Sequence, residues 1–337
     1  HYQPGPLTSD EHTRYDCDIS FVSNASDTPE TLRNTRSDIL RNTPDLQQVY
    51  NLASERLLES HRAGSGIHWH YASLQTLIDE ALAATGRKLN QPQRREIHLQ
   101  LGVLADRCFR HDGLNWAHQF CQATGRKLRI YGAGWEKHPV FAPYAAGPAA
   151  FGHEMNCIYQ ASRINLQMIE TGFLHSRALD GLAAGGFFLA RYTIFDGRND
   201  RELAARRRIA EFLRQHPLRT YAEVRAALSP SLREDWDYLQ TLQYQPEGEQ
   251  VISELSMLRL LELYPDFPGT REALPGFAEI LFHDAASFAA QAQRYLNDEP
   301  ARIRLRDQMR QAVLEHYSYD ARWRQFLAGI TAGLAAD

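Results

Sequence analysis

One short segment combines a helix start, a cation and a carboxylate at a spacing that suits a phosphate-bearing ligand. Ser176 is a good helix N-cap and Arg177 follows it, so free backbone N–H groups and a bidentate cation would meet an anion. Asp180 lies three residues further on, on the same helical face, where its carboxylate could accept hydrogen bonds from a ribose. Gly185 and Gly186 would let the backbone approach a ligand closely. An Arg–Asp pair on a helix that ends at glycine is the alternative interpretation.

A glycine turn follows a short apolar run earlier in the chain. The run 128–131 is typical of a buried strand, and Gly132, Gly134 and Trp135 come directly after it. Ligands of α/β proteins bind at the carboxyl ends of strands, so this turn is a candidate ligand contact. It is not a dinucleotide fingerprint, because Lys137 occupies the position of the third glycine. A tight turn with a packed tryptophan is the alternative interpretation.

A third group, Tyr159, Ser162 and Arg163, stands at the end of an expected helix, just before an expected strand. Arg163 could interact with the C-terminal dipole of that helix, or it could provide a second contact to a diphosphate. The residues alone favour the dipole role.

These residues need a sheet to position them, and the chain alternates short apolar runs with helical patterns. Helices are expected at about 154–162 and 177–184, and two long helical blocks at 28–125 and 195–272. The alternation predicts an α/β fold with a parallel sheet and helices on both faces. Residues 1–16 are expected to form a lead-in or linker. Five strands are expected, at 17–23, 128–132, 164–169, 187–192 and 280–283.

Composition excludes several classes of protein. The 337 residues carry 37 Lys+Arg and 41 Asp+Glu, a net charge of −4, so no excess positive charge favours nucleic acid. No apolar stretch approaches the roughly 20 residues of a transmembrane helix. The four cysteines form no CxxC pair and are expected to be buried free thiols in a reducing cytoplasm.

Neither a metal nor an organic cofactor is expected. His68 and His70 stand two residues apart, but no third ligand is close in the sequence. A nicotinamide-dependent oxidoreductase would need GxGxxG directly after the first strand, where Asn24-Ala25-Ser26 supplies no glycine.

Taken in order, five segments resemble one family, the CgeB-like group 1 glycosyltransferases, which are GT-B enzymes. The segments read CDISFVS, LRIYGAGWE, YQASRINLQ, GFLHSRALDGLAAGGFFLARY and HYSYDARWRQFL. They match the carboxy-terminal, nucleotide-sugar-binding half of that architecture and leave the helical blocks unmatched. The resemblance implies a Rossmann-like domain from 17–27, 126–194 and 273–337, with large helical insertions at 28–125 and 195–272.

The resemblance also implies residues that bind the donor, a nucleoside diphosphate sugar. Arg177 and Arg163 would stabilise the diphosphate as it leaves, without a metal ion. Asp180 stands where the family usually has Glu, and would contact the ribose. The remaining candidate donor contacts are Ser23, Asn24, Gly132, Gly134, Trp135, Tyr159, Ser162, His175, Ser176, Gly185 and Gly186.

The chain departs from the family pattern at its start. The acceptor half of a GT-B enzyme normally precedes the donor half, whereas here the first expected strand begins at residue 17. Either an upstream acceptor domain is missing or the helical insertions replace part of it, and the absence of an initiator Met favours the former. The general base usually comes from the acceptor half, so none is assigned.

Two functions are expected. The first is a cytoplasmic glycosyltransferase, or its donor domain, that transfers a sugar to an acceptor hydroxyl on a glycan such as a cell-surface polysaccharide, a protein or a small molecule. The second is a non-enzymatic interaction module, in which a degenerate Rossmann core presents the inserted helices to a partner. The phosphate-binding pattern around Arg177 favours the first.

Overall fold

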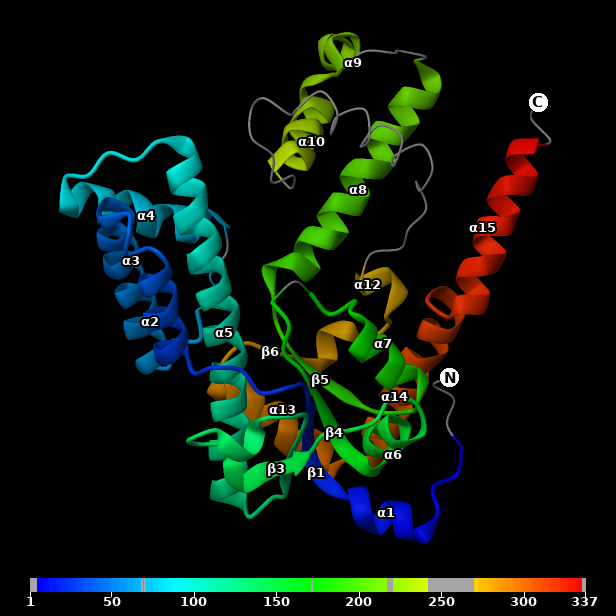
Figure 1. Ribbon diagram of the computed structural model, residues 1–337. Coiled ribbons are helices and arrows are strands. Elements are labelled where there is room, and N and C mark those ends of the chain that lie inside the picture. Colours follow the sequence, from blue (N-terminus) through cyan, green and yellow to red (C-terminus); the bar gives the residue numbers. More distant parts are fainter. Residues whose placement is uncertain are drawn as a thin grey trace. The chain divides into compact units, whose positions relative to one another are not determined.

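The computed structural model describes residues 5–67, 69, 71–170, 172–216, 221–241 and 270–334. The chain forms two compact units, described separately below (Figure 1). The first comprises His1–Ile194 and Pro275–Asp337, and the second comprises Phe195–Leu274. His68 and His70, considered above as metal ligands, lie outside the described residues.

The first unit is built on a six-stranded, all-parallel sheet in the order β3-β2-β1-β4-β5-β6. This confirms the predicted α/β fold, and it is the strand order of a Rossmann-like domain. The short strand β3 was not expected, because three small residues carry no strand signal. The strands are β1 (Cys17–Val22), β2 (Leu128–Tyr131), β3 (Ala145–Gly147), β4 (Ser162–Gln167), β5 (Phe188–Arg191) and β6 (Leu281–Phe282).

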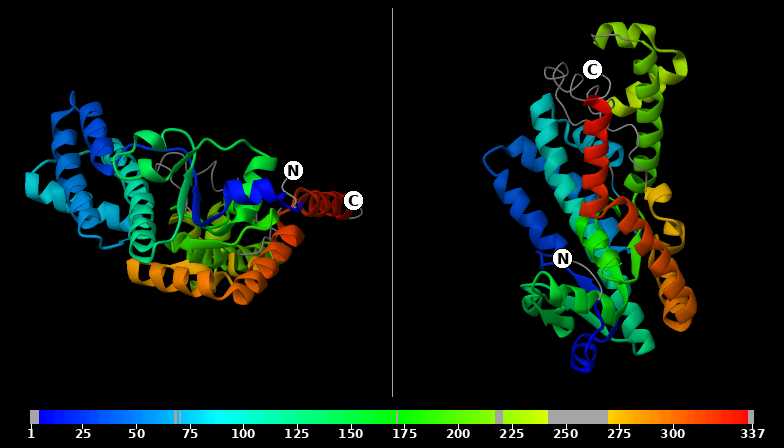
Figure 2. Two further views of the ribbon diagram at one scale, coloured as in Figure 1. Left: turned by 90° about the horizontal axis from the view of Figure 1, so that it is seen from below. Right: turned by 90° about the vertical axis from the view of Figure 1, so that its right-hand side faces the viewer.

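Helices cover the sheet. α6 (His153–Ala161) packs on β1 and β4 and contacts α7 (Ser176–Ala183), while α14 (Glu299–His316) packs on α7. α13 (Ala285–Asn297) contacts β4, β6 and α5 (Gln91–Thr124), and Figure 2 (left) shows it in orange below the strands. α1 (Ser9–Tyr15) lies against α6, and α15 (Tyr319–Leu334) ends the described chain.

A helical block follows β1 and has a core of its own. Its helices are α2 (Pro29–Ile39), α3 (Pro44–Arg62), α4 (Tyr71–Thr85) and the first half of α5. α5 has 34 residues and is therefore about 50 Å long. Asn90 caps its start in a capping box, and Gly125 ends it in the left-handed conformation at φ 66°, as the glycine signal predicts. The block's fully buried core residues include Val49, Tyr50, Leu57, Ile78, Ile97, Leu101 and Leu104.

The second half of α5 belongs to the sheet. Its Trp116 and Phe120 meet Phe282 of β6 and Phe288 of α13 edge to face, at centroid distances of 6.2 and 6.0 Å. One continuous helix therefore contributes to two cores.

The second unit is helical. It contains α8 (Ile194–Gln215) from its second residue onward, α9 (Tyr221–Ala227), α10 (Pro230–Thr241) and α12 (Thr270–Ala273). A small cluster that includes Ile209, Val224 and the fully buried Trp236 forms its core.

All four cysteines are buried and free, as expected. Among the described residues, no helix combines the length and the apolar character that crossing a membrane requires.

Candidate ligand site at the carboxyl edge of the sheet

The loops after β1 and β2 interlock at the carboxyl edge of the sheet. The Trp135 Nε1–H donates to the Ser23 carbonyl oxygen at 2.5 Å, and the Trp135 side chain is fully buried. Gly132 has φ 135°, and a Cβ there would lie 2.2 Å from the same carbonyl oxygen. Only glycine fits this position without displacing the β1 loop. Gly132 and Trp135 therefore hold Ser23 in place, and the indole packs inside the fold.

Two further contacts complete this interlock. The Ala133 N–H donates to the Asn24 side-chain oxygen at 3.1 Å, and the Ala25 N–H donates to the Ala133 carbonyl at 2.9 Å. Gly134 also has a positive φ, 91°, and starts a 3₁₀ turn. The Asn24 side chain thus fixes the two loops to each other.

The start of α7 differs by one residue from the expectation. His175 is the N-cap, with extended backbone, and its Nδ1 accepts from the Arg177 N–H at 3.2 Å. Ser176, the expected cap, is the first helical residue and is exposed. Burial and the neighbouring Arg177 charge lower the pKa of His175, which keeps its ring neutral and able to accept.

Arg177 is a partly buried cation that lacks a full set of partners. Its Nη2 donates to the Ser23 Oγ at 3.4 Å, and its guanidinium lies 5.9 Å from the centre of the Phe21 ring. Its Nη1 is buried and has no hydrogen-bond partner among the described residues. Burial lowers the pKa of Arg177. A buried donor of this kind is costly unless something binds it, and an anion is the natural complement.

The position of Arg177 matches the topological switch point of the sheet. β1 and β4 are neighbours, while the chain leaves them in opposite directions along the sheet order. Ser23 follows β1, and α7 follows β4, so the Arg177–Ser23 contact bridges the two strand ends. Open α/β sheets bind ligands in the crevice at this point.

The sequence analysis missed a second cation near Arg177. Arg110 of α5 is close enough for its charge to lower the pKa of Arg177, and its buried Nε has no partner among the described residues. Its Nη2 forms an ion pair with Asp106 at 3.7 Å. α5 comes close here because Gly113 lies against Met168, where a Cβ would stand 2.3 Å from the sulfur. The available signal in the sequence was Arg110 one helical turn before Gly113.

The sequence analysis also missed two polar residues, one at the carboxyl end of β4 and one in the loop that follows. Gln167 ends β4 and is 2% exposed, yet neither atom of its side-chain amide has a partner among the described residues. Glu170 follows in the next loop, where burial, and secondarily the Asp106 charge, raise its pKa to about 8. Its carboxyl therefore carries a proton near neutral pH and can donate one.

Tyr159 lies on α6, which contacts α7, and Asp180 lies on α7, the helix that carries Arg177. Tyr159 is buried on α6, contacts Phe188 at 5.7 Å between ring centres, and interacts electrostatically with Arg177. Asp180 is half-buried one turn along α7, and burial raises its pKa.

The structure does not bring Ser162 and Arg163 to this edge. The expected strand began at 164, but β4 begins at Ser162, which pairs with Cys17 at the start of β1. Arg163 is exposed and its Nη1 donates to Asp18 Oδ1 at 3.1 Å. Both residues thus lie at the amino edge, opposite Arg177.

The glycines after α7 also serve packing. Gly185 has φ 96°. A Cβ on Gly186 would lie 3.0 Å from Asn165 Nδ2 and from the carbonyls of Tyr159 and Gly181. Because these glycines precede β5, they too stand toward the amino edge.

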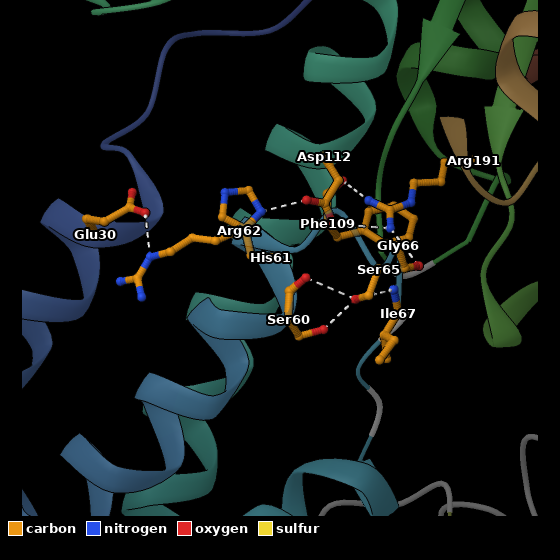
Figure 3. A network of polar contacts seen from close by, with 10 residues as sticks. All are labelled: Glu30, Ser60, His61, Arg62, Ser65, Gly66, Ile67, Phe109, Asp112 and Arg191. Atoms are coloured by element: carbon orange, nitrogen blue, oxygen red, sulfur yellow. Dashed lines mark hydrogen bonds and ion pairs between the residues drawn. The ribbon is translucent and has the colours of Figure 1, made fainter. Parts of the chain in front are cut away.

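A different buried arginine closes the carboxyl end of β5 (Figure 3). Arg191 contacts Asp112 Oδ2 at 3.4 Å and donates to the carbonyls of Gly66, at 3.0 Å, and Phe109. The other Asp112 oxygen meets His61 Nδ1 at 2.5 Å. This network joins the end of α3 and the loop after it to α5 and β5.

Among the described residues, one group of side chains could hold a metal ion: Glu11, His153 and Cys157, on α1 and α6. It is separate from the carboxyl-edge residues.

The amino-acid sequence matches the model of a known protein family. The model of the glycosyl transferase-like family matches residues 110–238 and 262–328, a span that includes Arg110, Gly132 and Arg177. Strand β1 lies outside the match. No curated protein and no solved structure matches the chain significantly. The family model covers more than half of the sequence, and the chain belongs to the glycosyl transferase-like family.

Proposed function

We propose that the chain transfers a sugar from a nucleoside diphosphate sugar to an acceptor hydroxyl, with the donor bound at the carboxyl edge of the sheet. The observation that carries the proposal is Arg177, a partly buried guanidinium whose buried Nη1 has no partner among the described residues. Membership of the glycosyl transferase-like family supports the reaction class. An interaction module would have no need for such a cation at the switch point.

The proposed chemistry is stabilisation of the leaving group. The bond between the sugar's anomeric carbon and the diphosphate oxygen breaks, and a bond from the acceptor oxygen to that carbon forms. The acceptor's proton goes to a base, and the electron pair of the broken bond remains on the diphosphate. Arg177 and the positive end of the α7 dipole would stabilise this growing negative charge in a partly dry crevice, without a metal ion.

Arg110 replaces Arg163 as the proposed second cation. The Arg110 charge lowers the pKa of Arg177, and both guanidinium groups would gain from a bound dianion. Arg163 is paired with Asp18 at the opposite edge, so it has no part in this proposal.

The finer assignments are also proposals. Asp180 would accept hydrogen bonds from the ribose, and Ser23, Asn24 and Tyr159 would border the donor. The fold would be the donor half of a GT-B enzyme of the CgeB-like kind, acting in the cytoplasm on a glycan, protein or small-molecule acceptor. The helical block, which continues through α5 toward Arg110, would lie nearest the acceptor.

Calorimetric titration with UDP, GDP and TDP, without metal and then with Mg²⁺, tests the donor site. We expect one nucleotide to bind at micromolar concentration, and Arg177→Met to weaken it at least tenfold, which is about 1.4 kcal/mol. Arg110→Met should weaken binding less, because its Asp106 partner already offsets part of its charge. Arg163→Met is the matched control and should bind like the wild type. Equal losses in Arg163→Met and Arg177→Met, or no binding of any nucleotide, would contradict the assignment.

A further inference from the structure

We propose that Glu11, His153 and Cys157 form a binding site for a divalent transition-metal ion, with Zn²⁺ as the best match, that ties α1 to α6. The three residues offer a carboxylate oxygen, an imidazole nitrogen and a sulfur, and these atoms all lie within 4.8 Å of one another. Thiolate and imidazole together favour Zn²⁺ over Mg²⁺ or Ca²⁺, which prefer oxygen ligands.

The two ligands on α6 already have the spacing of a metal site. His153 and Cys157 are four residues apart, so they share one face of the helix. The distance from Cys157 Sγ to His153 Nε2 is 3.5 Å. Zn–S and Zn–N bonds of about 2.3 and 2.1 Å at a tetrahedral angle place sulfur and nitrogen about 3.6 Å apart, close to this distance. No change in this pair is needed for a metal to bind.

The third ligand is held in place by its own helix. One Glu11 oxygen, Oε2, accepts from the backbone N–H and the hydroxyl of Thr8, each at 2.8 Å, in the capping box of α1. The other oxygen, Oε1, lies 2.5 Å from His153 Nε2. A tetrahedral Zn²⁺ would need these two atoms about 3.4 Å apart, so the side chains must separate by less than about 1 Å. The Thr8 contacts would then orient the carboxylate from behind.

The exposed fraction differs among the three ligands, so the fourth coordination position of a bound metal would face solvent. Cys157 is 1% exposed, whereas the His153 side chain is 79% exposed. A metal here would have protein on the Cys157 side and solvent on the other, where water would complete the tetrahedron. On binding, the metal–sulfur bond forms as the thiol proton leaves to solvent.

The α1–α6 contact does not depend on the metal, which makes the site testable. Glu154 receives the Tyr15 hydroxyl on Oε1 and the Ala150 N–H on Oε2, both at 2.8 Å. Glu154 is therefore fully engaged and is not offered as a ligand. Variants of the metal ligands should keep α1 docked through this contact.

The experiment uses the full chain stripped of metal with EDTA. Zn²⁺ affinity is measured by competition with a chromogenic chelator, and Co²⁺ is added separately to record absorption. We expect one Zn²⁺ per chain and a cobalt–thiolate charge-transfer band. Cys157→Ser should abolish the band and lower the Zn²⁺ affinity at least tenfold. His153→Gln, a substitution at an exposed side chain, should lower the Zn²⁺ affinity by a similar factor.

Two controls make the result decisive. Cys121→Ser changes a buried cysteine on α5, and Glu154→Gln changes the neighbouring carboxylate, so both should retain the band and the wild-type Zn²⁺ affinity. A wild type without the band, or one whose Zn²⁺ affinity equals that of the His153→Gln variant, would overturn the site. No readout uses a nucleotide, so this result is independent of the proposed transferase activity.

Discussion

Arg177, which is partly buried, and Arg191, which is fully buried, lie at the carboxyl edge of one sheet, and their surroundings differ sharply. Arg191 has a carboxylate, two backbone carbonyls and two aromatic rings, Phe109 and Trp116, at 4.1 and 4.4 Å. Arg177 has one hydroxyl at 3.4 Å and a buried nitrogen with no partner among the described residues.

The difference separates a structural cation from one that is available for a ligand. The protein itself supplies the negative charge beside Arg191, so nothing further is needed there. Beside Arg177 the fold supplies dipoles but no carboxylate in an ion pair with it among the described residues. We conclude that Arg191 mainly stabilises the fold, whereas Arg177 serves binding, and four substitutions test that division.

The largest effect is expected from Arg191→Met. It would leave Asp112, 5% exposed, without its cation, and breaking a buried pair in this way costs about 3–5 kcal/mol. Urea unfolding measures the loss. The control is Arg294→Met, which breaks an exposed pair with Glu279 and should cost less than about 1 kcal/mol. Adding Asp112→Asn to Arg191→Met should recover part of the loss; a loss below about 1 kcal/mol for Arg191→Met alone would refute the structural role.

Gly132→Ala is expected to damage both the fold and the site. The new Cβ would collide with the Ser23 carbonyl, in a backbone conformation that costs non-glycine residues of order 1–3 kcal/mol. Ser23 would move away from Arg177, so nucleotide affinity should fall as well, which calorimetry would detect. Gly102→Ala, in open space on α5, is the matched control and should stabilise the chain by up to about 1 kcal/mol. Unchanged nucleotide affinity in a folded Gly132→Ala protein would show that the position of Ser23 does not affect nucleotide binding.

Glu170→Gln tests a second carboxyl that interacts electrostatically with Arg191. The folded chain holds the Glu170 proton up to about pH 8, whereas the carboxyl ordinarily loses it near 4.5. The folded state therefore binds more protons between these values, and its stability falls as the pH rises through them. Glu170→Gln should remove this decline and be more stable than the wild type at pH 8 by about 1 kcal/mol or more.

The measurement is urea unfolding between pH 5 and 8. Glu55→Gln is the control, because a hydrogen bond from Arg62 lowers the pKa of Glu55, so its pH effect falls at more acidic pH. Parallel pH profiles for the wild type and Glu170→Gln would show that the Glu170 carboxyl does not keep its proton near neutral pH.

The smallest change in stability is expected from Arg177→Met without ligand. The substitution removes an unpaired buried donor and leaves no buried carboxylate behind, so the free energy of unfolding should stay within about 0.5 kcal/mol or rise. Thermal and urea unfolding of the unliganded protein check this. A loss as large as that of Arg191→Met would remove the distinction between the two arginines.

Much of the sheet was predictable because its strands are short apolar runs bounded by glycine and polar residues. The five expected strands correspond to β1, β2, β4, β5 and β6, and each expected end lies within two residues of the observed one. The strand β3 could not be predicted, because its three small residues are extended only through pairing with Ile130 and Tyr131. Tertiary contacts rather than propensity determine such a strand.

The candidate site was predicted less completely, for reasons of geometry. Arg177 was found because a helix start after a strand has a local signal. Arg163 was assigned to the ligand although it stands at the start of β4, and the starts of parallel strands lie at the amino edge, opposite Arg177. Arg110 was missed because the sequence does not indicate where along a helix of 34 residues the sheet makes contact.

The continuity of α5 has a consequence for how this protein can vary in length. Ile97 and Leu104 lie in the core of the helical block and Trp116 and Phe120 in the core beside the sheet, on one uninterrupted helix without a hinge. Inserting a single residue between them would turn the block by about 100° and advance it by about 1.5 Å. Only insertions near whole turns, of about 7 or 11 residues, would preserve the rotational phase. The continuous helix thus fixes the orientation of the block relative to the sheet. Chimaeras that exchange the block must be joined in helical register.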